Sequence, residues 1–252
     1  MKTRLSIILL LSAMATEGLS QETAPSNCPL AMVVETDGKT DEWPLEWIED
    51  SDKTMSYNVC SDGSNLYIRM KTSDDIVRRK IAIFGLYIWM DPNGKKKRKL
   101  GLRFPTGAEA TERIAARKET QDYSKLSSSE KAEIQKELNK SLIVNLEMME
   151  LIGLADDPLV STRSGITNGI KVAIASNEDG AYVYEAIIPF KAFRLSKATI
   201  SVLGIGIETG KYTPPPTKQP IGSALQRGVG YQGQRNSNLS IPSGVWLKVK
   251  LK

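Results

Sequence analysis

Short segments in which apolar and polar residues alternate recur along this chain, and they constrain its fold more than any other feature. In residues 64–71, Leu66, Ile68 and Met70 fall on one face of an extended strand, and polar or amphipathic residues fall on the other. Residues 245–251 alternate in the same way, with lysines on the polar face, which suits a solvated strand at the edge of a sheet.

Further strands are predicted along the chain, most of them separated by clusters of Gly, Pro, Asn or Asp. They cover residues 55–60, 81–90, 100–104, 169–175, 181–188 and 200–208, and the apolar run 146–153, which is also compatible with a helix. Many short strands with little helix between them predict an all-β fold, an antiparallel β-sandwich.

A tight turn is predicted at residues 91–94, Asp-Pro-Asn-Gly, because proline presets φ at the first corner and Asn-Gly tolerates the positive φ that follows. The turn joins residues 87–90 to residues 100–104 as a hairpin, with the basic run 95–99 at its tip. A solvated hairpin end is the simpler interpretation of this run. The alternative is contact with an anionic polysaccharide or lipid surface, which salt would weaken.

Two stretches interrupt the strand pattern. Residues 106–145 predict a short helical insertion lying on the sandwich, in which Ser127 and Glu130 have the spacing of a capping box. The apolar stripe that follows consists of Ile134, Leu138 and Leu142. Residues 210–240 are rich in Pro and Gly and poor in apolar residues, and they predict a flexible loop.

The start of the chain has the layout of a signal peptide. Basic residues at positions 2 and 4 precede an apolar run and then small residues, which predicts a signal peptide at 1–20 that is cleaved after Ser20. No apolar stretch is long enough for a membrane helix. We therefore expect residues 21–252 to form a single β-sandwich domain that is periplasmic or secreted. An oxidising compartment permits a disulfide between Cys28 and Cys60, and two buried thiols are the alternative.

The sequence contains no histidine, which excludes several classes of chemistry. Serine and cysteine hydrolases with a histidine base, zinc sites that need imidazole and histidine-ligated haem are all ruled out. Glu147 and Glu150 lie three positions apart on a predicted strand and so face opposite sides, unlike the paired carboxylates of a glycosidase. We therefore predict that the protein is not an enzyme. Its formal net charge of +5 and its expected export give no reason to predict a nucleic-acid partner.

Five motifs occur in a fixed order along the chain. They are Thr-Asp-Gly-Lys-Thr-Asp-Glu-Trp-Pro at 36–44, Ser-Asp-Gly-Ser-Asn-Leu-Tyr-Ile at 61–68, Tyr-Ile-Trp-Met-Asp-Pro-Asn-Gly at 87–94, Tyr-Glu-Ala-Ile-Ile-Pro-Phe at 184–190 and Val-Trp-Leu-Lys-Val-Lys-Leu at 245–251. In this order they resemble the family nine carbohydrate-binding module, and in particular its exported, domain-sized Bacteroidetes-type versions, whose ligands are often unassigned. The resemblance implies an immunoglobulin-like or jelly-roll β-sandwich that binds carbohydrate without catalysis.

Sugar-binding members of that family hold a sugar ring between two tryptophans. At the corresponding places this chain has the apolar run 81–84 and Tyr231, whereas Arg103 matches an arginine that hydrogen-bonds the ligand. If the residues on either side of Trp89 are core, Tyr87 and Trp89 lie on the outer face, with Arg103 beside them on the paired strand. If Trp89 is core, or if the helical insertion covers that face of the sheet, the cluster has only a packing role. The candidate ligand-binding residues are therefore Tyr87, Trp89, Arg103 and Tyr231.

The resemblance also implies a possible structural calcium ion, which needs several convergent oxygens. The acidic candidates are Asp37, Asp41, Glu42, Asp74, Asp75 and Asp91. Trp43 is expected to pin the first loop to the sandwich. The predicted partner is a glycan or polysaccharide. The alternative is an envelope protein partner, met by an interaction or assembly module of the same fold that binds no sugar.

Overall fold

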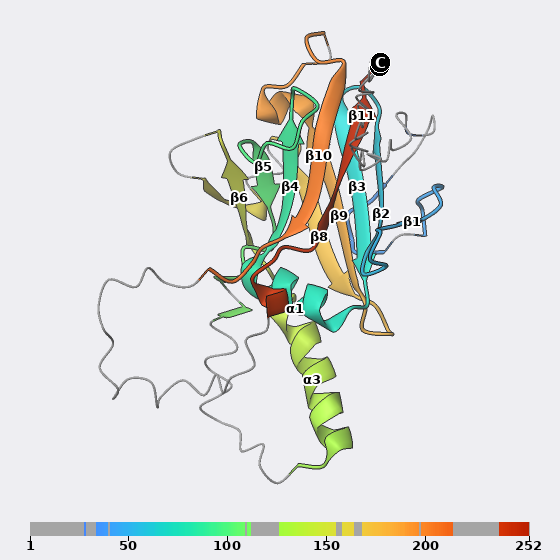
Figure 1. The fold of residues 1–252 in the computed structure, drawn as a ribbon, viewed down its shortest axis with the longest axis vertical. Helices are drawn as coiled ribbons and strands as arrows, with labels where there is room; N and C mark the ends of the chain where they lie inside the picture. The colour runs from blue at the N-terminus through green and yellow to red at the C-terminus, as the bar shows by residue number, and fades with distance from the viewer. Residues whose placement is uncertain are drawn as a thin grey trace, which may run out of the picture.

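The computed structural model describes residues 28, 34–39, 41–108, 110–111, 126–154, 158–163, 168–196, 198–213 and 237–251. In these residues two antiparallel sheets face each other around one hydrophobic core (Figure 1). The five-stranded sheet has the order β1-β2-β3-β9-β8, and the six-stranded sheet has the order β11-β10-β4-β5-β6-β7. The prediction of an all-β, sandwich-like fold is confirmed.

Most of the strands agree with those predicted from the sequence. The five-stranded sheet contains β1 (Ile48–Glu49), β2 (Ser56–Ser61), β3 (Asn65–Thr72), β8 (Lys171–Ser176) and β9 (Tyr182–Pro189). The six-stranded sheet contains β4 (Leu86–Asp91), β5 (Gly101–Arg103), β6 (Met148–Ile152), β7 (Leu159–Ser161), β10 (Val202–Thr209) and β11 (Gly244–Lys250). The lysine-bearing strand β11 is an edge strand, as expected. The short strands β1 and β7 were not predicted.

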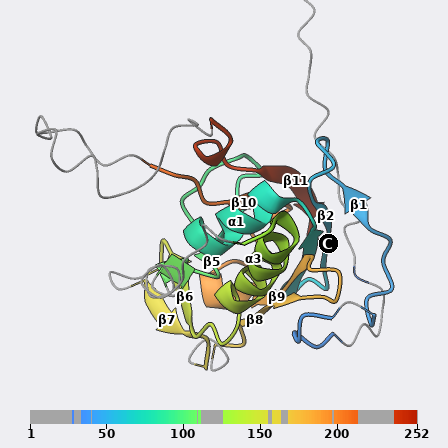
Figure 2. The same cartoon turned by 90° about the horizontal axis from the view of Figure 1, so that it is seen from below.

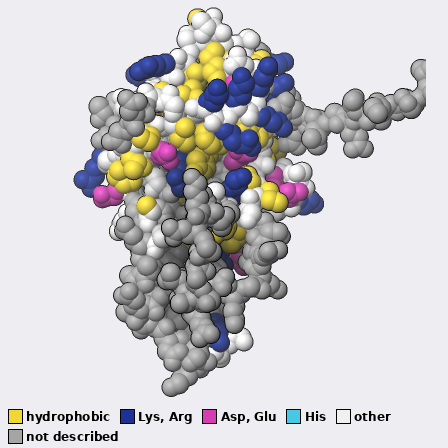
Figure 3. Space-filling view, turned by 60° about the vertical axis from the view of Figure 1, so that its left-hand side comes forward, with side chains coloured by type: hydrophobic (Ala, Val, Ile, Leu, Met, Phe, Trp, Pro, Cys, Tyr) yellow, Lys and Arg dark blue, Asp and Glu magenta, His cyan; other side chains and the backbone are white. Residues whose placement is uncertain are grey.

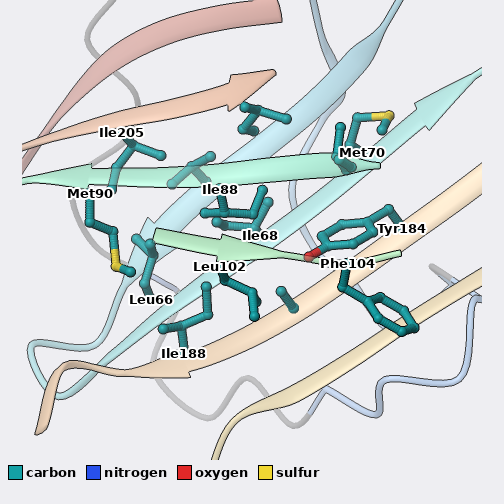
Figure 4. Packing of buried hydrophobic residues seen from close by; sticks show 14 of the residues in the cluster. Leu66, Ile68, Met70, Ile88, Met90, Leu102, Phe104, Tyr184, Ile188 and Ile205 are labelled. Carbon is teal, nitrogen blue, oxygen red and sulfur yellow. The ribbon is translucent and has the colours of Figure 1, made fainter. Parts of the chain in front are cut away.

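The alternation predicted for β3 is confirmed by its packing. Leu66, Ile68 and Met70 are each 0% exposed and point into the core. Ile88 of β4 and Leu102 of β5, from the facing sheet, are equally buried and meet them between the layers (Figure 4). Burying a side chain of this size stabilises the fold by roughly 1.5 to 3 kcal/mol, so these residues contribute strongly to holding the two sheets together.

The strand predicted at residues 81–90 is wrong in its first half. Residues 81–84 end the helix α1 (Asp75–Phe84), and only from Leu86 does the chain become a strand. Asp74 caps this helix by accepting a hydrogen bond from the Val77 amide at 2.8 Å. Gly85, with φ 86°, ends it. A short apolar run does not distinguish helix from strand, and here the cap and the terminal glycine decide.

The capping box predicted for the helical insertion is present at the start of α3 (Ser128–Leu142). The Glu130 amide donates to the Ser127 hydroxyl, and the Ser127 amide donates to the Glu130 carboxylate. The insertion was expected to lie on the sandwich, and with α1 the helix lies at one end of it and extends away from the sheets (Figures 1 and 2). Only Leu142 of the expected stripe is buried. None of the described helices is long and apolar enough to cross a membrane.

The chain before β1 is tied to the five-stranded sheet by a disulfide. Cys28 and Cys60 are joined with an S–S distance of 2.05 Å, and the Cys28 amide donates to the Ser61 carbonyl at 3.1 Å. The bond spans a sequence separation of 32 residues. Such a bond is typical of an oxidising, extracytoplasmic environment.

We predict that replacing Cys28 and Cys60 together by alanine lowers the free energy of unfolding by about 3 kcal/mol, because the unfolded chain regains the entropy of an open loop. Urea unfolding followed by tryptophan fluorescence measures the change. Reduction should destabilise the unmodified protein to a similar extent and leave the double variant unaffected. Equal stability of the variant and the oxidised protein would contradict the prediction.

Candidate ligand-binding face

The outer face of the six-stranded sheet carries the tyrosine and tryptophan singled out from the sequence. Ile88 and Met90 are each 0% exposed between the sheets, so Tyr87 and Trp89 point the other way. The two aromatic rings are stacked, with centroids 5.1 Å apart and planes inclined by 13°. Both therefore belong to the outward side of β4, as the alternation predicts.

Arg103 joins this cluster from the neighbouring strand, directly opposite Tyr87. Its guanidinium lies 5.1 Å from the centroid of the Tyr87 ring. It also donates to the Glu150 carboxylate at 3.1 Å and to the Phe84 carbonyl at 3.0 Å. Burial raises the pKa of Tyr87, against the opposing effect of the Arg103 charge. The result is an aromatic surface with a fixed cation and a fixed carboxylate beside it.

The cluster is less accessible than a free surface would be. Tyr87 and Arg103 are half-buried, and Trp89 is only 8% exposed. Trp89 lies flat on the sheet: a Cβ atom at Gly101, its cross-strand neighbour, would come 2.9 Å from its ring. In this part of the sheet, the ring of Tyr87 is therefore more accessible to a ligand than the ring of Trp89.

Sequence reasoning missed a second part of this face, formed by Trp246 and Glu208. Trp246 is opposite Gly206, which is in turn opposite Trp89, so the two tryptophans lie in one row across the strands. A Cβ atom at Gly206 would come 2.6 Å from the Trp246 ring, which therefore also lies flat. The Trp246 indole donates to the Glu208 carboxylate at 2.8 Å. Glycines at alternate positions of β10 were the signal that could have revealed this row.

Arg98, from the basic run between β4 and β5, closes the row. It donates to both oxygens of the Glu208 carboxylate, at 2.6 and 2.5 Å, and its guanidinium lies 5.4 Å from the centroid of the Trp246 ring. The bond to Glu208 raises the pKa of Arg98, so the guanidinium stays charged. A bidentate pair of this kind holds the planar guanidinium in a defined orientation. Tyr231, the remaining candidate, lies outside the described residues.

On the outer face of the five-stranded sheet, in contrast, the segment before β1 covers the region around Glu185. Trp43 is 5% exposed and donates its indole N–H to the Glu185 carboxylate at 2.7 Å, so it pins this segment as expected. Glu185 also accepts from the Gly38 and Asp37 amides, at 2.8 and 3.2 Å. Burial raises the pKa of Glu185 to about 7, against the effect of these hydrogen bonds.

Two of the acidic residues considered for calcium lie beside Glu185. The carboxylate oxygens of Asp37, Glu42 and Glu185 lie within 4.8 Å of one another. N–H groups already donate to all three carboxylates, including the Lys39 amide to Asp37 and the Glu35 amide to Glu42. The other candidates are not part of this group: Asp74 caps α1, Asp91 accepts bonds within its own turn, Asp75 pairs with Arg78 and Asp41 is exposed.

A shallow pocket of about 460 Å³ opens on the five-stranded sheet. Its lining includes Tyr67, Ile187 and Lys171, which lie side by side on β3, β9 and β8. The Tyr67 hydroxyl donates to the Asp62 carboxylate at 2.9 Å. The pocket contains none of the residues singled out from the sequence.

Comparisons of the chain with models of protein families, with curated proteins and with solved structures find no match. The candidate face is therefore interpreted from its own geometry.

We predict that Glu185→Gln removes a pH dependence of stability between about pH 4.5 and pH 7. Because the pKa of Glu185 is raised in the folded protein, the carboxylate destabilises the fold above pH 7, and this penalty disappears as the pH falls towards the unfolded value. The lowered pKa values of Asp62 and Asp91 act only at more acidic pH.

The measurement is urea unfolding at a series of pH values. The unmodified protein should gain on the order of 2 to 3 kcal/mol between pH 7 and pH 5 that the Gln variant does not gain. Parallel profiles for the two proteins would show that Glu185 is already ionised at pH 5.

Proposed function

We propose that this protein binds a glycan on the outer face of its six-stranded sheet and catalyses no reaction. The observation that carries the proposal is the group of outward aromatic rings: Trp246 and Trp89 lie in one row across the strands, and Tyr87 stacks on Trp89. A charged pair lies beside Trp246 and another beside Tyr87. The two more accessible rings, Tyr87 and Trp246, belong to strands that are two spacings apart, about 10 Å, which is on the scale of two linked sugar rings. Flat apolar rings complement the C–H faces of pyranoses.

The charged pairs supply the polar contacts that such a ligand needs. Arg103 with Glu150 and Arg98 with Glu208 each place a donor and an acceptor beside an aromatic ring. Sugar hydroxyls both donate and accept hydrogen bonds, so paired charges can bind them without leaving an unpaired ion. Because the side chains are already held by each other and by the sheet, little side-chain entropy would be lost on binding.

The remaining parts of the proposal concern classification and location. We place the chain with the family nine carbohydrate-binding modules on its ordered motifs, and we propose an immunoglobulin-like or jelly-roll arrangement for its sandwich. The disulfide between Cys28 and Cys60 supports a location outside the cytosol, either in the periplasm or in the extracellular medium after secretion. The lack of histidine in the sequence supports a binding role over a catalytic one.

A glycan array followed by isothermal titration calorimetry with the best hits tests the proposal. We expect saturable binding that Trp246→Ala and Tyr87→Ala each weaken about tenfold, a loss of about 1.4 kcal/mol. Trp47→Ala is the matched control, because Trp47 is also half-buried beside cationic side chains but belongs to the covered side of the five-stranded sheet. It should bind like the unmodified protein.

Thermal melts confirm that each variant is folded before its binding is compared. Lack of any glycan binding, or equal weakening by Trp47→Ala and Trp246→Ala, would contradict the proposal. Co-purification with an envelope protein in the absence of sugar binding would favour the protein-interaction alternative.

A further inference from the structure

The loop between β4 and β5 is folded back onto the sheet, although its basic run was expected at a solvated hairpin tip. A Cβ atom at Gly204, in β10, would come 2.2 Å from the Lys95 carbonyl, so the loop backbone passes directly over this strand. Gly94 lies against the Val202 side chain in the same way. The Asp91 carboxylate accepts from the Lys97 amide at 3.1 Å and thereby fixes the bend.

Only one of the basic side chains in this loop forms an ion pair with a described carboxylate. Arg98 pairs with Glu208, whereas no described carboxylate forms an ion pair with the four lysines of the loop. All of these lysines are exposed. Asp91 is 2% exposed, and its oxygens accept hydrogen bonds from the Asn93 and Lys97 amides. Its charge acts on Lys97 and leaves the charges of the other three lysines without a described partner.

Strand β11 adds cations beside the loop. Lys248 is opposite Gly204, over which the loop passes, and Lys250 is opposite Val202. Both lysines are on the outward side of the sheet, in the strand that also carries Trp246. We call these cations the basic rim, which consists of Lys95, Lys96, Lys97, Lys99, Lys248 and Lys250.

The rim borders the aromatic row. Hydrophobic side chains occupy the middle of the surface seen in Figure 3, and Lys and Arg side chains gather beside them. Arg98 connects the two features, since it belongs to the loop and lies over the Trp246 ring. Like charges held close together repel each other, and an anionic ligand that spans them would relieve this repulsion.

We propose that the ligand of this face is an acidic polysaccharide, whose anionic groups contact the basic rim while its sugar rings contact Tyr87 and the accessible part of Trp246. This inference rests on the proposed glycan binding and names its ligand class. A flat lipid surface fits less well, because membrane-bound faces insert protruding apolar side chains. The described exposed large hydrophobic residues are Ile76, Val144, Leu159, Tyr212 and Ile241, and none lies on β10, on β11 or in the loop.

Calorimetric titration with oligomers of polygalacturonate and of chondroitin sulfate tests the proposal. The titrations are made at low and at physiological salt, and comparison of the two probes distinguishes recognition of carboxylate from recognition of sulfate. Fully methyl-esterified polygalacturonate is the neutral match, since it keeps the sugar rings and lacks the charge. We expect the acidic form of at least one probe to bind about tenfold or more tightly than a neutral match, with an affinity that salt weakens.

The rim variant combines Lys95→Gln, Lys96→Gln and Lys97→Gln, and a second variant combines Lys248→Gln with Lys250→Gln. Each should weaken acidic-glycan binding about tenfold and reduce its salt dependence. The matched control replaces two exposed lysines on the side of the five-stranded sheet, Lys171→Gln with Lys191→Gln. This variant should bind like the unmodified protein. All replacements are at the surface, and thermal melts verify their folding.

The outcomes separate the two proposals. If neutral glycans bind as tightly as acidic ones and still depend on Tyr87 and Trp246, glycan binding holds and the acidic preference is wrong. If no glycan binds, both are wrong. Salt-sensitive binding of duplex DNA or of phosphatidylserine vesicles that the rim variant loses and Trp246→Ala retains would assign the rim to another macromolecule and overturn the inference.

Discussion

Side chains of a strand alternate between the two faces of a sheet. When one face is buried in the core, the other face must therefore lie against solvent or against another part of the chain. Here the buried faces are apolar in both sheets, and Ile68 of β3 and Ile88 of β4 have no exposed surface. This packing fixes the register of the strands, because a slip by one residue would move Arg69 or Trp89 between the sheets. The outward residues are therefore positioned by a core that they do not enter.

The outward faces of the two sheets differ in how much of them the rest of the chain covers. On the five-stranded sheet, Arg69 and Glu185 are 2% and 0% exposed, since the segment that carries Trp43 lies over them. Buried charges of this kind are costly unless they are hydrogen-bonded, and Arg69 donates to Asn58 at 2.8 Å and to the Leu45 carbonyl. The part of that face around Arg69 and Glu185 is closed by the protein's own chain. The six-stranded sheet keeps part of its aromatic surface accessible, which is why the ligand-binding proposal concerns this side.

The extent to which the sequence predicted this arrangement depends on the range of the contacts involved. The cluster of Tyr87, Trp89 and Arg103 follows from alternation and from pairing between neighbours in the sequence, and both are local. Trp246 was missed because its place depends on β10 lying between β4 and β11, a long-range pairing that no local pattern encodes. The burial of Arg69 was missed for the same reason, since the residues that cover it come from a separate segment. The error at residues 81–84 is different: it arose because a short apolar run fits two local structures equally well.

The glycines of the outward face connect the fold to the proposed role. Glycine in the interior of a strand costs about 0.5 to 1 kcal/mol relative to alanine, yet β10 has one at positions 204 and 206, and β5 begins with Gly101. At each position a Cβ atom would come within 3.0 Å of what lies above it, whether the Lys95 carbonyl, the Trp246 ring or the Trp89 ring. Larger residues would push the rings and the loop away from the sheet. The glycines thus lower the stability of the strands but allow the aromatic rings to lie flat and close to the sheet. Without these glycines, the rings would stand up from the sheet and expose their edges in place of their planes.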